Sequence, residues 1–531
     1  MNYNRVDIKV VMKIRTENFL KNMKINFIFY LITIIISFIS RGIFIKVLGA
    51  DITGLNSLYT SLIGLLNVAE LGVGIAVGYS LYKPLSEQNY EKINDIMILF
   101  KYYYNRIARL ILILGILLSF ILPFLIKGQI NLTLVYLYYF MYLINCVISY
   151  IFSYKQTLII ADQKQYKISY ILNISKIVKV IFQCFIIVSI KSFFLWLLLE
   201  IIFNFISMYL ANKKIDREYY YYLKDINKKS ISVIKSENIE IGKNIKNIFF
   251  HKIASFVIDQ TDAIIISAFS TLKETAIYAN YMMIINALSG LISTAIGSVM
   301  PSIGNLIAEK SDEDSYNRFK ILYLFDNILA LFICIVTYEI INKFVVFWVG
   351  INYLFSNYIV LVIIMNLYIK ISRGSVDRFK DGYGIYWDIY APIIESVINL
   401  IFSICLAYKI GIVGVFIGTV ISNFIIVVLW KPYILFKIGF KKKISLYIKQ
   451  AYYIYFFNIL IWVILNYIYK NYLDLIYVNN LFLNIIVHFI LVSLLCLILI
   501  FIFYFNNKEF KSLLEVLNNE VLSRVIYKFK R

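Results

Sequence analysis

Long apolar runs recur along the whole chain, and they constrain its fold more than any other feature. Each run is about 20 residues long, the length that an α-helix needs to cross the hydrocarbon core of a bilayer. Of the 531 residues, 61% are hydrophobic and 16% are charged, so a soluble core could not bury this apolar length. The strands of a membrane barrel would alternate between apolar and polar residues over about 10 positions. We therefore predict an all-α, polytopic membrane protein.

The apolar runs predict fourteen transmembrane helices. We place them at residues 26–47, 54–82, 107–126, 131–154, 168–190, 193–212, 248–270, 276–300, 321–341, 355–372, 389–408, 411–430, 450–469 and 481–504. The longest internal polar stretch follows the sixth span, so we interpret it as the linker between two pseudo-symmetric six-helix halves. The predicted divisions are a basic cytoplasmic N-terminus (1–25), the N-terminal half (26–212), the cytoplasmic linker (213–247), the C-terminal half (248–430), two additional transmembrane helices (431–504) and a cytoplasmic amphipathic tail (505–531).

One helix pair occurs twice in the sequence. Residues 40–84 consist of an apolar segment, a tight turn around Gly49 and a second apolar segment, and residues 264–290 repeat this pattern more weakly. Shifting one copy onto the other by 222 positions places Tyr59 on Tyr281. Internal repeats of this kind are typical of transporters.

Basic residues divide unevenly between the two sides of this map. Counted from a cytoplasmic N-terminus, the inner segments hold 41 Lys and Arg residues. The opposite loops hold only six, which are Lys127, Lys191, Lys273, Lys343, Lys409 and Lys470. This asymmetry follows the positive-inside rule and predicts that both termini are cytoplasmic. The formal net charge of +22 is therefore mostly a topology signal and does not indicate nucleic-acid binding.

Polar side chains form a stripe on the predicted span 168–190. Asn173, Lys176, Lys179 and Gln183 follow one another at spacings of three, three and four, which place them on one helix face. We interpret the stripe as the lining of a hydrated cavity that binds substrate. In the alternative interpretation, Lys176 reaches the cytoplasmic headgroups and Lys179 pairs with a carboxylate.

Other charged residues lie inside predicted spans. Arg41 joins the substrate-binding candidates, while Asp259 and Asp262, one helical turn apart, and Glu70 are candidates for ion coupling or charge balance. Charges inside a membrane are costly and normally face the bundle interior or a water-filled cavity. The two aspartates suit the binding of a proton or Na⁺ during transport, or they are static partners of the basic residues.

Catalytic and metal-binding patterns are missing from the sequence. The five cysteines lie singly inside apolar runs, and the two histidines, His251 and His488, are too far apart in the sequence to suggest a metal site. We find no pairing of a nucleophile with a base and no phosphate-binding loop. The sequence therefore predicts a protein that is not an enzyme and that needs no cofactor or metal.

Four stretches carry a family resemblance. They are Ser40–Pro84 with its Ala69-Glu70-Leu71-Gly72 core, Asp259–Ser267, Tyr278–Ala308 and Phe379–Ser422. In this order they resemble the polysaccharide-transporter branch, the Wzx-type oligosaccharide flippases, of the multidrug/oligosaccharidyl-lipid/polysaccharide (MOP) flippase superfamily. The similarity covers most of residues 20–440 and agrees with the span count and with two cytoplasmic termini.

The resemblance implies a function and a location. It implies an alternating-access flippase that moves polyprenyl-pyrophosphate-linked oligosaccharide repeat units across the bacterial plasma membrane for capsule, O-antigen or other surface polysaccharide synthesis. The implied partners are this lipid-linked substrate, membrane lipids and, in the same assembly process, a polysaccharide polymerase and glycosyltransferases.

Three other functions remain open at this stage. A cation-coupled multidrug exporter of the same superfamily would have a more apolar cavity with acidic residues, so Arg41, Lys176 and Lys179 argue modestly against it. A polysaccharide polymerase would need a large external loop, whereas the longest one here, 342–356, has about 15 residues. A non-transporting scaffold of a polysaccharide-assembly complex is also compatible with the sequence.

Overall fold

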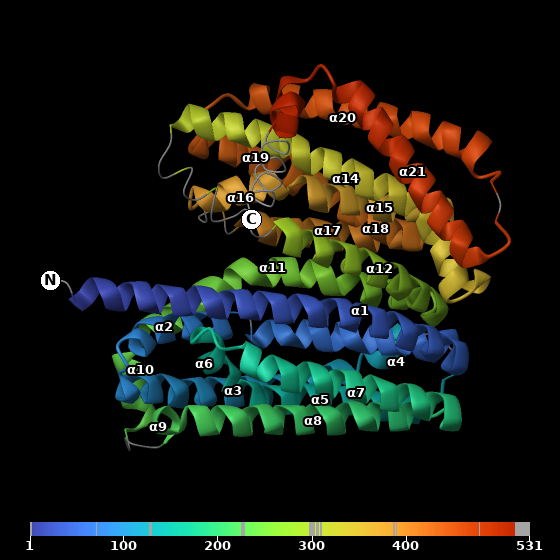
Figure 1. Cartoon of the computed structure of the whole chain (residues 1–531). Helices are drawn as coiled ribbons and strands as arrows, with labels where there is room; N and C mark the ends of the chain where they lie inside the picture. Colours follow the sequence, from blue (N-terminus) through green and yellow to red (C-terminus); the bar gives the residue numbers. More distant parts are fainter. Residues whose placement is uncertain are drawn as a thin grey trace, which may run out of the picture. The chain divides into compact units, whose positions relative to one another are not determined.

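All regular secondary structure described in the computed structural model is helical (Figure 1). The model describes the backbone of residues 3–70, 72–126, 130–224, 229–296, 303, 307, 311–385, 388, 390–476 and 478–515. Within these ranges, side chains are described from residue 21 onward, except at 69, 247, 250–259 and 294–296. The all-α prediction is thereby confirmed.

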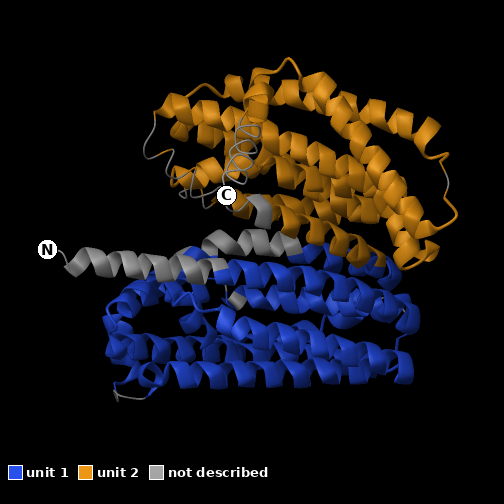
Figure 2. Cartoon of the chain, in the orientation of Figure 1, with its two compact units in different colours: residues 1–276 blue, residues 277–531 orange. Residues whose placement is uncertain are grey.

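The chain folds into two compact units, residues 1–276 and 277–531 (Figure 2). The predicted halves, 26–212 and 248–430, are a different division that rests on repeat symmetry, and they stay a prediction. The helical elements of the first unit are α1 (Tyr3–Leu66), η1 (Asn67–Glu70), α2 (Val73–Ser86), α3 (Tyr90–Ser119), α4 (Leu122–Leu125), α5 (Leu132–Ser153), α6 (Gln156–Ala161), α7 (Tyr166–Ile190), α8 (Phe193–Glu218), α9 (Tyr220–Leu223), α10 (Ile231–Glu237) and α11 (Ile239–Phe269).

The second unit also consists of long helices joined by short connections. Its elements are α12 (Leu272–Ile296, whose first turn belongs to the first unit), α14 (Asp312–Trp348), η3 (Ile351–Tyr353), α15 (Asn357–Ser372), α16 (Gly374–Gly382), α17 (Tyr390–Ile410), α18 (Ile412–Asn423), η4 (Phe424–Trp430), α19 (Lys431–Ile434), η5 (Leu435–Gly439), α20 (Ile444–Ile468), η6 (Tyr469–Leu473) and α21 (Leu481–Tyr504). Helix α14 packs against α15, α20 and α21, while α17 packs against α18.

Within the described residues, the predicted spans fall on these helices, but the count differs. By length and composition, eleven helices in the described part of the chain could cross a membrane. The count is lower by three. Helix α1 covers two predicted spans or parts of them, and α3 begins with the polar segment that precedes the span predicted at 107–126. Helix α11, which carries the span predicted at 248–270, is not among the eleven. The structure thus supports a polytopic protein with about eleven spans, and the finer count of fourteen stays a prediction.

The predicted turn and repeat both have structural counterparts. Helix α1 is interrupted at Gly49, whose φ of 84° and ψ of 179° are not helical. Tyr59 and Tyr281, which the repeat aligns, are both fully buried. The Tyr59 hydroxyl donates to the carbonyl oxygen of Val135 near the start of α5, and the Tyr281 hydroxyl accepts from the backbone N–H of Phe355 just before α15. Both tyrosines therefore tie the second helix of the pair to the beginning of another helix.

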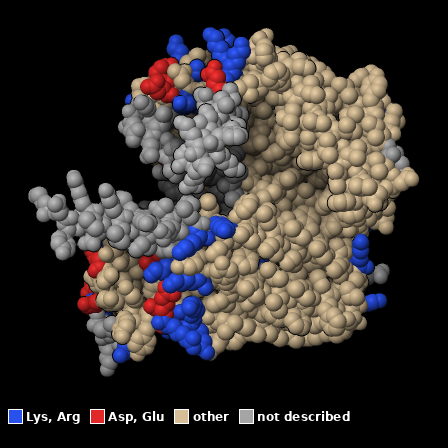
Figure 3. Space-filling view, viewed as in Figure 1, with Lys and Arg blue, Asp and Glu red and all other residues tan. Residues whose placement is uncertain are grey.

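Charged side chains gather near the ends of the helices. In the first unit, Figure 3 shows Lys, Arg, Asp and Glu side chains concentrated at one end, whereas the long flank beside them is uncharged. The helices α3, α5, α7 and α8 form much of this unit, with α5 in contact with α3 and α8, and α7 in contact with α8. An apolar flank along parallel helices is what a membrane-spanning bundle requires.

Candidate functional site

The helix is broken between α1 and α2, inside a predicted membrane span. The 3₁₀ turn η1 follows α1, and Gly72 then takes a left-handed φ of 92° before α2 starts. A Cβ on Gly72 would also lie 2.9 Å from Cβ of Ile248 and 3.0 Å from the carbonyl oxygen of Ile245, both on α11. Glycine is therefore required here both by the backbone angle and by the close approach of α11. Broken helices in membrane proteins occur where the backbone lines a cavity.

Two adjoining cavities open at this break. Their volumes are about 630 and 350 Å³, and Asn67, Glu70 and Tyr150 line both of them. The Tyr104 hydroxyl donates to the Glu70 carboxylate, and the Tyr150 hydroxyl donates to Oδ1 of Asn67 at 2.8 Å. The site therefore presents one carboxylate and one amide among phenol groups, a set that can accept hydrogen bonds from a substrate or hold a cation or proton.

Arg41 lies on the same helix as this site. It is half-buried, and its Nη2 donates to the Ser57 hydroxyl at 3.3 Å, across the break at Gly49. Ser57 follows Asn56, which accepts a hydrogen bond from the hydroxyl of Tyr142, a residue that lines the smaller cavity. Arg41 thus shares α1 with Ile63, which lines the smaller cavity, but Arg41 itself does not line either of the two cavities.

Two residues of the predicted stripe on α7, Lys179 and Gln183, form their ion pair and hydrogen bonds with residues of α8. Nζ of Lys179 lies 2.5 Å from Oε1 of Glu200, and the side chains are 15% and 24% exposed. Gln183 is buried and donates through Nε2 to Oε2 of Glu200 at 2.9 Å and to the carbonyl oxygen of Trp196 at 3.1 Å. Lys179 thus has the carboxylate partner that the alternative interpretation of the stripe required.

The two other residues of the stripe differ from this pair. Asn173 donates to the carbonyl oxygen of Ser169 one turn earlier at 2.8 Å. Lys176 is exposed, and the ion pairs and hydrogen bonds found among the described side chains do not include it. Of the two lysines, Lys176 is therefore the one whose charge is not matched at short range by a described carboxylate.

Of the two aspartates predicted on α11, the structure describes the side chain of one. The side chain of Asp259 lies outside the described residues, whereas that of Asp262 is half-buried. Helix α11 packs against α1, where a Cβ on Gly64 would come within 2.3 Å of Oε1 of Gln260. Asp262 therefore belongs to the same unit as Arg41 and Glu70, on a helix held closely against theirs. Among the described residues, no cluster of His, Cys, Asp and Glu could hold a metal ion.

Several charged residues that pair across helices were missed by sequence reasoning. Besides Glu200, the fully buried Asp326 of α14 lies 2.6 Å from Nη2 of Arg378 on α16 and also accepts from the Ser375 hydroxyl. In the first unit, the buried Asp95 of α3 lies 3.1 Å from Nζ of Lys229. The available signal was a single acidic residue within or beside an apolar run, which does not reveal its partner.

Comparison of whole structures shows which known fold these helices adopt. The lipid II flippase MurJ in an inward closed conformation matches with a TM-score of 0.65 and 16% identity over 90% of this chain and 98% of that chain. A multidrug resistance MATE family transporter of the MOP superfamily, in an inward-facing conformation, matches with a TM-score of 0.53 and 16% identity over 74% of this chain and 92% of that chain. The helices of this chain therefore adopt the fold of these two structures.

This fold agrees with part of the family resemblance found in the sequence, because one matched protein is named as a member of the MOP superfamily. No protein-family model matches the chain, and no curated protein matches it at a significant level. The likeness to solved structures therefore shows the fold and does not confirm the polysaccharide-transporter branch. The names of the two matched proteins describe a flippase and a transporter.

Proposed function

We propose that this chain is a flippase that moves polyprenyl-pyrophosphate-linked oligosaccharide repeat units across the bacterial plasma membrane for surface polysaccharide synthesis, by alternating access. The observation that carries the proposal is the extent of the match to the lipid II flippase, a protein named for the lipid that it moves. That match covers 90% of this chain, whereas the match to the multidrug transporter covers 74%. The proposal includes the Wzx-type branch, fourteen spans in two halves of six plus two, and cytoplasmic termini.

The charges of the first unit supply a second argument. A pyrophosphate brings at least two negative charges into a region shielded from water, where a nearby cation attracts it more strongly than in bulk solvent. We assign this attraction to Arg41 and Lys176, together with the other residues of the stripe on α7, Lys179, Asn173 and Gln183. The carboxylates of Glu70, Asp259 and Asp262 then balance the charge of the empty cavity or couple transport to an ion.

A cation-coupled multidrug exporter is the second candidate. It is favoured by the Lys179–Glu200 pair, which cancels one of the positive charges expected to attract a phosphate. The tyrosines around Glu70 also suit an organic cation, because aromatic faces attract positive charge.

The decisive experiment follows substrate in cells. Deletion of the gene is expected to leave lipid-linked repeat units on the inner leaflet and to abolish the surface polymer. The wild-type gene and the exposed-site control Lys409→Gln should both restore the polymer. Normal polymer together with raised drug sensitivity in the deletion strain would contradict the flippase proposal and support the exporter.

A further inference from the structure

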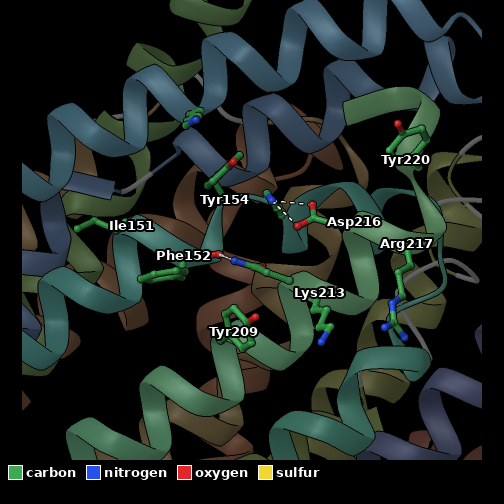
Figure 4. A pocket seen from close by; sticks show the side chains of 11 residues that line it. Ile151, Phe152, Tyr154, Tyr209, Lys213, Asp216, Arg217 and Tyr220 are labelled. Carbon is green, nitrogen blue, oxygen red and sulfur yellow. Dashed lines mark hydrogen bonds and ion pairs between the residues drawn. The ribbon is translucent and has the colours of Figure 1, made fainter. Parts of the chain in front are cut away.

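A basic pocket lies apart from the Glu70 site, between α3, α8 and the connection from α5 to α6 (Figure 4). Its volume is about 760 Å³, which is within the range of small-molecule sites. Four basic side chains and one acidic side chain line it, giving a net charge of +3: they are Lys101, Lys155, Lys213, Arg217 and Asp216. Three tyrosines also line the pocket, Tyr154, Tyr209 and Tyr220.

The basic residues of this pocket have different roles. Nζ of Lys155 lies 2.6 and 2.8 Å from the two carboxylate oxygens of Asp216, so these two charges cancel within the pocket. Lys101, Lys213 and Arg217 are exposed and take part in no ion pair found among the described residues. Lys213 and Arg217 lie four residues apart and project to the same side of α8 (Figure 4). Three positive charges without a described partner therefore line a space whose one carboxylate, Asp216, is already bound to Lys155.

Apolar side chains at the end of α5 also line the pocket, and an apolar stripe on α8 begins beside them. Ile151 and Phe152 line the pocket beside Tyr209. From Tyr209, an exposed apolar stripe follows α8 at spacings of three and four residues: Ile202, Phe205, Ile206, Tyr209 and Leu210. The rings of Phe152 and Phe205 are in edge contact, with centroids 5.4 Å apart. A charged end and an apolar stripe thus form one continuous surface.

We infer that this pocket binds the phosphate headgroup of an anionic glycerophospholipid, with its acyl chains lying along the apolar stripe of α8. Basic pockets between transmembrane helices on the cytoplasmic side are suited to such headgroups. The positive-inside pattern places Lys213 and Arg217 on that side. A free phosphate ion would use the positive charges and leave the stripe uncovered, so the combination selects a lipid. This site is separate from the proposed transport path and does not depend on the transported substrate.

The test uses the full-length protein in a neutral detergent and native mass spectrometry with added lipid. Wild-type protein is expected to retain phosphatidylglycerol in preference to phosphatidylcholine. Each Lys or Arg near an anionic lipid contributes about 1 kcal/mol, so Lys213→Gln with Arg217→Gln should weaken phosphatidylglycerol binding by about 30-fold. The matched control is Lys214→Gln with Lys235→Gln, which removes two exposed charges of the same unit that do not line the pocket.

Three outcomes would overturn the inference. Equal binding of phosphatidylglycerol by the pocket variant and the wild type would show that these charges do not hold the lipid. An equal loss in the control variant would show a general effect of surface charge. Retention of inorganic phosphate with the affinity of phosphatidylglycerol would show an anion site without a lipid. Thermal unfolding of all variants at the wild-type temperature would exclude misfolding as the reason for lost binding.

Discussion

Replacement of Lys179 by Gln tests whether the stripe on α7 is a structural pair or a cavity lining. Exposed ion pairs contribute about 0.2–1 kcal/mol, whereas breaking a fully buried pair costs about 3–5 kcal/mol. With its charged atoms 2.5 Å apart and its side chains 15% and 24% exposed, the Lys179–Glu200 pair lies between these limits. We expect Lys179→Gln to lower the free energy of unfolding by about 2 kcal/mol, a change of about 30-fold in the unfolding equilibrium constant.

The same helix offers a matched control for this prediction. Lys176→Gln removes an equal charge one turn away, but Lys176 is exposed and has no described partner, so its effect should stay within about 0.5 kcal/mol. In the double variant Lys179→Gln with Glu200→Gln, no charge is left unpaired, and most of the lost stability should return. Gln183 would still be able to donate to the new amide oxygen at position 200.

Unfolding in detergent, followed by intrinsic fluorescence at increasing denaturant, measures these differences. Substrate flipping by the same variants in proteoliposomes separates the two roles of the stripe. If Lys176→Gln reduces flipping without reducing stability, Lys176 acts on substrate. If Lys179→Gln is as stable as the wild type, or if Glu200→Gln does not rescue it, the energetic importance that we assign to this pair is refuted.

Two further predictions concern the broken helix and the second unit. Glu70→Gln keeps an acceptor for the Tyr104 hydroxyl but removes the charge, so the variant should fold normally and its transport should no longer depend on the ion gradient. The control Tyr104→Phe should keep that dependence. Unchanged gradient dependence in proteoliposomes that contain Glu70→Gln would exclude Glu70 as the coupling group. Arg378→Met should destabilise the protein by about 3 kcal/mol because Asp326 is left buried and charged. Adding Asp326→Asn should recover most of that loss in detergent unfolding, and no recovery would show that the packing of Arg378 matters more than its charge.

The helices of this fold were predictable because their signal is local. Each apolar run is long enough to identify a helix without reference to any other part of the chain. The interruption at Gly49 and the equivalence of Tyr59 and Tyr281 were visible for the same reason, since a turn and a repeat can be read along the sequence. The two compact units were less predictable, because α11 follows the predicted linker but packs against α1 in the first unit.

The polar site was predictable only in part, because partners lie on different helices. Four polar residues on one face of α7 were recognised from their spacing, yet Glu200, which binds two of them, lies on α8. Likewise, 52 residues separate Asp326 from Arg378. Helical periodicity says which side chains share a face, but it does not say which face of another helix they meet. A carboxylate within an apolar run is therefore better read as one half of a pair than as a separate site.

The basic residues on the predicted cytoplasmic side are of two kinds: some pair with carboxylates, and others have no described ion-pair partner. The positive-inside rule counts Lys and Arg and is almost indifferent to acidic residues, so a carboxylate can pair with a topology-setting lysine without altering the orientation of the helix. Lys167 with Glu218 and Lys229 with Asp95 are such pairs. Lys213 and Arg217 have no described ion-pair partner, because the acidic residues beside Arg217 pair elsewhere, Asp216 with Lys155 and Glu218 with Lys164 and Lys167. Selection for orientation alone does not require them to face one pocket, and this convergence is the reason to look for an anionic ligand there.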